Sequence, residues 1–132
     1  MKPYQAVGYM MLQTTAITAI TSNRVWHGLR PEDSVVPSVN YFELGGASRW
    51  HGIERQQVAI NCRANSAGGA RDLAREVIDL FQGDTGIRGT ISSFSVLRCS
   101  LKNDNGLNPE PDSDIYNAPV DILLIYPSKT VS

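Results

Sequence analysis

Cysteine and histidine are scarce in this sequence. Two histidines, His27 and His51, and two cysteines, Cys62 and Cys99, stand alone in a chain of 132 residues. Zinc sites are usually built from pairs of ligands within about five positions of each other, and a disulfide framework needs more than two cysteines. We therefore expect no metal and no cofactor, and we expect both thiols to be reduced and buried on apolar strand faces.

Long apolar runs and an excess of one charge are also missing. The longest apolar run, Ile122–Tyr126, is far shorter than the ~20 residues of a membrane-spanning helix. Polar residues at positions 13–15 interrupt the N-terminal segment where a secretory signal would be continuous. Twelve basic and thirteen acidic residues give a net charge of −1, which provides no general attraction to nucleic acid or to an anionic membrane. We expect a protein of a reducing, aqueous compartment with no membrane partner.

The composition that remains is typical of a globular protein. Apolar residues make up 42% of the chain and charged residues 19%, and the length suits one domain over residues 1–132. Residues 1–75 contain 8 basic and 5 acidic groups (net +3), whereas residues 76–132 contain 4 and 8 (net −4). Such a split suits copies of the chain that meet through unlike surfaces, and scattered solvated charge is the alternative.

Hydrophobic periodicity predicts two main helices. Apolar residues recur at three- and four-residue steps over residues 4–20, and again from Ala70 to Phe81. Ser66 is suited to cap the start of the second helix, and Gly83 is placed to end it. The opposite, solvated face of this helix carries Arg71, Asp72, Arg75, Glu76 and Asp79.

Alternating apolar and polar residues predict the strands. Residues 38–44 and 57–64 are expected to pair as a hairpin, with a long tip over residues 45–54 that begins at two glycines. The other expected strands are residues 24–27, residues 91–102 and residues 120–126, of which the last is the most apolar and therefore central. Prolines and glycines assign residues 28–37 and 103–115 to loops. The predicted fold is an α+β domain with a single four- to five-stranded, mostly antiparallel and possibly mixed sheet, and with two main helices packed on one face.

Catalytic motifs are missing. The sequence contains no nucleophile elbow, no phosphate-binding lysine loop and no dinucleotide-binding glycine fingerprint. Asp121 is the one acid expected to be half-buried, and a single half-buried carboxylate is more often paired with an arginine than catalytic. We therefore expect that the protein is not an enzyme and has no catalytic residues.

Two groups of residues are candidates for binding. Arg49, Trp50, His51 and Arg55 combine aromatic and basic side chains, which protein interfaces use as anchors and which also stack on single-stranded bases. A tryptophan folded back on the sheet is the alternative. The loop over residues 103–115 carries the second group, whose four acids are Asp104, Glu110, Asp112 and Asp114.

Two segments of the sequence carry a family resemblance. They are NRVWHGLRPEDSVVPSVNYFEL (residues 23–44) and ERQQVAINCRANSAGGARDLAREVIDLF (residues 54–81). The matching positions are Arg24, Val25, Trp26, Pro31, Pro37, Val39, Val58, Ala70, Leu73, Ala74 and Val77. The chain resembles the phage tail terminator family, also called tail completion or tail-to-head joining proteins, found in long-tailed phages, prophages and gene transfer agents. Residues 13–23 depart from the family's leucine-rich first helix, which puts the end of that helix in doubt.

The resemblance implies a structural virion protein rather than an enzyme. Members form a homohexameric ring on the last ring of the tail tube, stop tube polymerisation and present the surface that the head-completion or connector protein binds. Packaged DNA passes through the lumen without specific binding. The implied location is the head-proximal end of the virion tail, after assembly in the host cytoplasm. Two rival functions remain at this point, a small sheet-based nucleic-acid-binding module and a ferredoxin-like small enzyme.

In such a ring we expect the hairpin cluster to lie at a subunit or partner interface. We expect the acidic loop to lie towards the lumen or the head-facing rim, because carboxylates would repel DNA and keep it mobile. The alternative is an ordinary solvated loop on the exterior of the ring.

Overall fold

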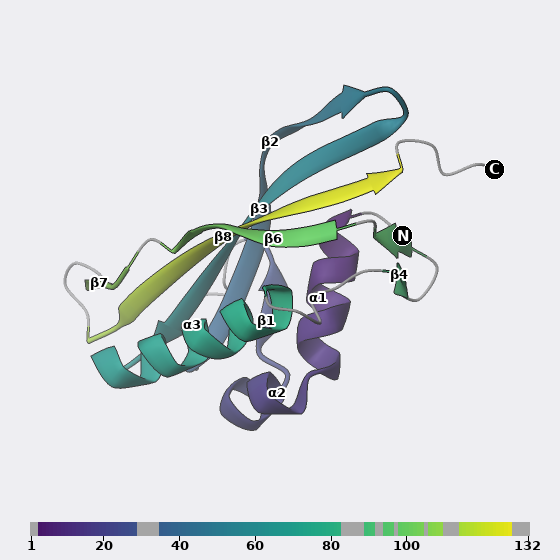
Figure 1. Cartoon of the computed structure of the whole chain (residues 1–132). Coiled ribbons are helices and arrows are strands. Elements are labelled where there is room, and N and C mark those ends of the chain that lie inside the picture. The colour runs from purple at the N-terminus through teal and green to yellow at the C-terminus, as the bar shows by residue number, and fades with distance from the viewer. Residues whose placement is uncertain are drawn as a thin grey trace.

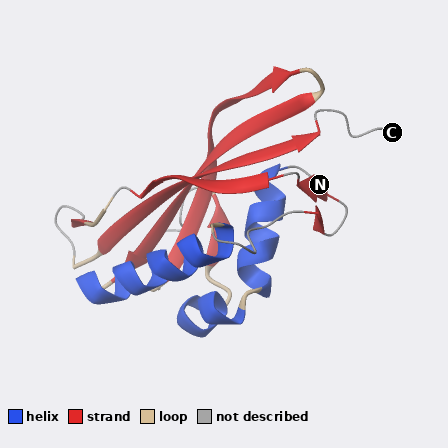
Figure 2. Ribbon diagram, in the orientation of Figure 1, coloured by secondary structure: helices blue, strands red, loops and turns tan. Residues whose placement is uncertain are grey.

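Helices cover one face of a twisted sheet in this computed structural model (Figures 1 and 2). The structure describes residues 3–28, 35–82, 89–91, 94–96, 98–104, 106–109 and 114–127. The helices in these ranges are α1 (Pro3–Gln13), α2 (Thr15–Thr21) and α3 (Ala67–Phe81). The strands of the main sheet are β1 (Val25–His27), β2 (Ser38–Trp50), β3 (Ile53–Ala64), β6 (Arg98–Asp104), β7 (Asn108–Pro109) and β8 (Tyr116–Pro127).

The main sheet is mixed. Its order is β1-β2-β3-β8-β6, with β7 pairing one end of β8; β1 runs parallel to β2, and the other pairs are antiparallel. β8 is therefore central, as its apolar sequence predicts. The α+β class is confirmed, but the described sheet has six strands where four or five were expected, and three helices stand where two were expected.

The core lies between the sheet and the helices. Every second residue from Gln56 to Ala64 in β3 and from Ala118 to Tyr126 in β8 is buried on the helix-bearing face, because successive side chains of a strand point to opposite faces. The apolar stripe of α3 packs on them, and Ser66 caps this helix as expected, its Oγ accepting a hydrogen bond from the Gly69 N–H at 3.0 Å. The expected helix end at Gly83 lies outside the described residues. The largest fully buried side chains are Phe81, Met11, Ile17, Ile60, Leu73, Ile122, Leu124, Val7, Val39, Val58 and Val77.

The expected single helix over residues 4–20 is wrong, because the helix is interrupted at Thr14. This residue is extended (φ −97°, ψ 111°), and its Oγ1 donates to the Met10 carbonyl oxygen at 2.7 Å. Threonine hydroxyls compete for backbone groups in this way, and β-branched residues lose rotamer freedom in helices. Ile17 and Thr21 are nevertheless buried, so the apolar period continues across the break.

The expected long tip of the hairpin is also wrong. β2 continues through the glycine pair to Trp50, with a bulge between Leu44 and Ser48, and β3 begins at Ile53. Gly45 has a φ of +67°, the left-handed conformation that allows a bulge without ending a strand. The turn is only His51-Gly52, and both residues have positive φ (48° and 79°), as in the tight turns that match strand twist.

The expected strand over residues 91–102 is divided. β4 (Gly89–Ile91) and β5 (Phe94–Val96) form a separate two-stranded sheet, and β6 begins at Arg98. The expected loop over residues 103–115 is wrong at its start, because Asp104 ends β6, and it contains the two-residue strand β7. A bulge between Leu101 and Asn103 accompanies the end of β6.

Candidate functional site

The tip of the β2–β3 hairpin projects past the helices (Figure 1). It is held by a cross-strand ion pair in which Arg49 Nη2 and Nε lie 2.9 Å and 3.3 Å from Glu54 Oε1. The Arg49 side chain is 69% exposed, whereas that of Glu54 is 14% exposed. An ion pair this exposed on one side adds little stability, but it fixes the position of the arginine at the surface.

The predicted interface cluster gathers at this tip but divides between the two faces of the hairpin. Arg49 shares the face of Glu54, which is the helix-bearing side, whereas Arg55 pairs with Ser48 on the opposite side. Arg55 and His51 are both exposed. Trp50 ends β2 next to the turn, and its side chain lies outside what the structure describes.

A pocket of about 430 Å³ lies beside the hairpin arginines. Ser48, Arg49, Ile53, Arg55 and Ile125 line it. Arginine beside apolar side chains is the composition of protein interfaces rather than of an acid–base site. The hairpin is therefore suited to bind a protein surface.

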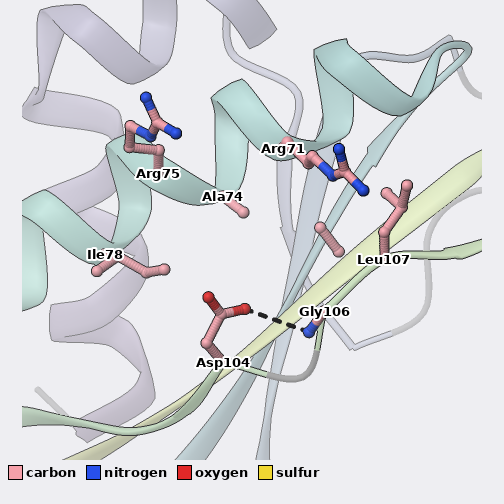
Figure 3. Close-up of a pocket in the computed structure, with 8 residues that line it drawn as sticks. Arg71, Ala74, Arg75, Ile78, Asp104, Gly106 and Leu107 are labelled. Carbon is pink, nitrogen blue, oxygen red and sulfur yellow. Dashed lines mark hydrogen bonds between the residues drawn. The ribbon is translucent and has the colours of Figure 1, made fainter.

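A second pocket, of about 400 Å³, lies between α3 and the connection from β6 to β7 (Figure 3). Arg71 and Arg75 come from successive turns of α3, and Asp104 lies on the other side, where its Oδ1 accepts a hydrogen bond from the Gly106 N–H at 3.2 Å. The remaining lining is apolar and consists of the aliphatic parts of Ala74, Ile78, Leu107 and Ala118, with Gly106.

Sequence reasoning missed this pocket. It assigned Arg71 and Arg75 to the solvated face of the helix, and both are indeed exposed. Their spacing of four residues places them side by side, which is the one available signal. That the chain after β6 returns to them cannot be seen in the sequence.

The structure describes two of the four predicted acids. Asp104 lies in the α3 pocket, and Asp114 is exposed just before β8. Glu110 and Asp112 lie outside the described residues. The acidic cluster as a whole, and its orientation in an assembly, therefore stays a prediction.

The two cysteines are buried, as predicted, and both are free. Burial raises the pKa of Cys99 to about 12 and the pKa of Cys62 further above its ordinary value, with a smaller contribution from the negative charge of Asp104. A thiol with a raised pKa is a poor nucleophile because little of it is thiolate at neutral pH. Among the described residues, His, Cys, Asp and Glu form no group that could hold a metal ion. None of the helices in the described ranges is long and apolar enough to span a membrane.

Comparison with known proteins finds a similar fold but no similar sequence. No family model and no curated protein sequence matches the chain. Its fold is similar to that of a chain in a solved structure described as the virion of a native gene transfer agent (GTA) particle, with a TM-score of 0.69 and 14% sequence identity. The similarity covers 93% of both chains. At this identity the comparison establishes a common fold over nearly the whole length.

Proposed function

We propose that the protein is a structural component of a phage-like virion, the tail terminator. In this role six copies form a ring on the last ring of the tail tube, end tube polymerisation and provide the surface that the head-completion protein binds. DNA passes through the lumen without being held, and no catalytic step is involved. The protein acts at the head-proximal end of the tail, after assembly in the host cytoplasm.

The observation that carries the proposal is the fold similarity to a chain of a gene transfer agent virion over 93% of both chains. The sequence resemblance to tail terminators supports the same role, because it rests on residues rather than on shape. Seven of the eleven matching residues are buried core positions: Val25, Val39, Val58, Ala70, Leu73, Ala74 and Val77. A fold can be shared at 14% identity because cores tolerate exchange when pattern and volume are kept.

A ring requires two different surfaces on each subunit, because copies related by rotation about a ring axis meet head to tail. The projecting hairpin and the α3 pocket lie on separate parts of the described chain, and each is a candidate for one of these surfaces. The charge split between residues 1–75 and 76–132 agrees with contacts between unlike surfaces.

Inactivation of the gene tests the proposal. Particles that lack the protein should carry tubes of uncontrolled length without heads, and the wild-type chain supplied in trans should restore tails of uniform length. Tails of normal length with joined heads in its absence would contradict the proposed role.

Native mass spectrometry and electron microscopy of the purified protein test the ring. We expect a monomer–hexamer equilibrium, shifted to hexamers by tube ends. Monomers alone would not decide the matter, because a tube end can be required as a template. A stable two-fold dimer, both in solution and on tails, would contradict the ring.

A further inference from the structure

The outward surface of α1 and α2 carries no charge. Residues 3–23, which include both helices, contain no Asp, Glu, Lys, Arg or His. Three large apolar side chains are exposed in the part of the chain that the structure describes, and two of them, Tyr9 and Leu12, lie on α1 and are each 41% exposed. They are three positions apart, so they are neighbours on one side of the helix.

α3 shows how this chain solvates a helix that faces water. Its exposed positions include Arg71, Asp72, Arg75 and Asp79. Charged residues are usual on the outward side of an amphipathic helix, and α1 and α2 depart from this pattern over their whole length. Exposed apolar surface of this kind marks an interaction site.

The sheet has a second apolar surface, on the face opposite the helices. Successive residues of a strand point to opposite faces, so the neighbours of the buried core positions lie on this face. No described helix lies over it, since α1, α2 and α3 are all on the other side of the sheet (Figures 1 and 2). We call the residues at its centre the β2–β3–β8 strip, which consists of Phe42, Leu44, Gln57, Ala59, Leu123 and Ile125.

The central strand has the sequence of a strand that is buried on both faces. An antiparallel sheet with one solvated face alternates apolar and polar residues, whereas a strand that is covered on both faces is continuously apolar. β8 is continuously apolar from Ile122 to Tyr126, and Leu123 and Ile125 of this run are half-buried members of the strip. The sequence of β8 therefore predicts a further layer of protein over this face.

A helix with an uncharged surface fits the strip. Three neighbouring strands are about 10 Å wide at the usual strand spacing, which is also the diameter of a helix with its side chains. Arg55 lies beside one end of the strip and Asp121 beside the other. The surface of α1 and α2 brings no like charge against either residue, so no charge repulsion opposes the contact.

We propose that the α1–α2 surface of one copy, with Tyr9 and Leu12, packs on the β2–β3–β8 strip of the next copy. The two surfaces lie on opposite sides of the sheet, so they cannot meet within one chain. The contact is heterologous, and it repeats from copy to copy until a ring closes. Ile125 also lines the pocket beside the hairpin arginines, so the contact is continuous with the candidate interface at the hairpin. This inference rests on the proposed function, because it names the surfaces through which that ring closes.

Paired charges test the contact, with sedimentation velocity as the measurement of self-association. L12K should weaken association at least about tenfold, because an ammonium buried without a partner is costly, and L123E should do the same from the other side. The double variant L12K/L123E should recover most of the lost association, since the two introduced charges then meet across the contact. V35K is the matched control, because it adds the same charge at the third exposed apolar residue, outside both surfaces, and should leave association unchanged.

Circular dichroism and thermal melting, at concentrations where the wild type is monomeric, separate folding from association. L12K should leave both unchanged, because Leu12 is exposed and lysine forms helices about as well as leucine. If L123E lowers the melting temperature, cross-linking of L12C/L123C with a short bismaleimide replaces it. This variant should yield a ladder of covalent species up to the size of the ring, and each single-cysteine variant should yield none. The native cysteines are buried and do not interfere.

The outcomes separate this inference from the proposed function. Rings that form as well from L12K as from the wild type, or a double variant that associates no better than L12K, would overturn the helix-on-sheet contact and leave the ring in place. Covalent dimers from L12C alone would place two α1 surfaces together, and L12K rings that lose only their attachment to tubes would place a tube protein on α1. Either result overturns the contact. Failure of the wild-type chain to form rings even on tube ends would overturn the proposed function, and this contact with it.

Discussion

Gly8 in α1 provides the sharpest test of how the first helix packs. The helix passes so close to β2 that a Cβ at Gly8 would overlap Tyr41 Oη and lie 2.6 Å from Cζ and 3.1 Å from Cε1. The Tyr41 ring cannot easily move away, because it is 8% exposed and its centroid lies 5.5 Å from the centroid of the His27 ring.

The expected effect of Gly8→Ala is the difference between two opposing contributions. In a helix interior alanine is favoured over glycine by ~1 kcal/mol. Overpacking of a filled core costs typically ~1–3 kcal/mol, and a contact this close belongs at the upper end. We therefore expect a net loss of about 1–2 kcal/mol in the free energy of unfolding, which lowers the melting temperature by about 3–10 °C for a chain of this size.

Urea denaturation and thermal melting followed by circular dichroism measure the change. Gly68→Ala in the first turn of α3 is the matched control, because no atom lies within 4 Å of the added Cβ, and it should be neutral or stabilising by up to about 1 kcal/mol. In a Tyr41→Leu background, which removes the clashing atoms, Gly8→Ala should cease to destabilise. If Gly8→Ala stabilises the wild-type protein as Gly68→Ala does, α1 does not pack on Tyr41 as described.

Three further predictions concern the thiols and the acidic loop. Cys62 and Cys99 should react slowly with a maleimide in the native protein and rapidly in denaturant, because both are buried; rapid native labelling of either would show that its strand face is wrong. Since burial raises both thiol pKa values above 9.0 in the folded state, the free energy of unfolding should be constant below about pH 9 and fall as the pH rises towards 12, by up to ~1.4 kcal/mol per pH unit for each thiol. Cys99→Ala should reduce this slope in urea titrations at pH 8 and pH 10, and an unchanged slope would refute the assignment. Replacing Asp104, Glu110, Asp112 and Asp114 by Asn or Gln should leave folding intact and slow DNA ejection if the loop faces the lumen, whereas normal ejection would exclude that placement.

Much of the fold could be predicted because buried apolar residues recur at the spacing of a helix or of a strand. The sequence predicts the apolar stripe of α3 and its Ser66 cap, because both depend on residues close together along the chain. It also predicts the central position of β8, because that strand is the most apolar. The interruption at Thr14 was not predicted. Ile17 and Thr21 remain buried beyond it, so the apolar period is the same for two helices as for one. Periodicity reports which face is buried, not whether the axis is continuous.

The sequence predicts that a hairpin connects β2 and β3, but it does not predict where the strands end and the turn lies. Two adjacent glycines are a usual sign that a strand ends, yet here Gly45 forms a bulge and the strand continues. Pairing with β3, which is a tertiary contact, decides between these outcomes. The true turn at His51-Gly52 has a positive φ at a non-glycine residue, which a search for Asn-Gly or Gly-Gly pairs does not detect.

The α3 pocket was out of reach for a different reason. Arg71 and Asp104 are 33 positions apart, and the pocket exists only because β6, which follows β8 in the order of the sheet, ends beside α3. The same topology places the hairpin tip at the opposite end of β3 and β8. Pairing along the whole length of β3 and β8 fixes this separation, and no spacing of residues along the chain indicates it.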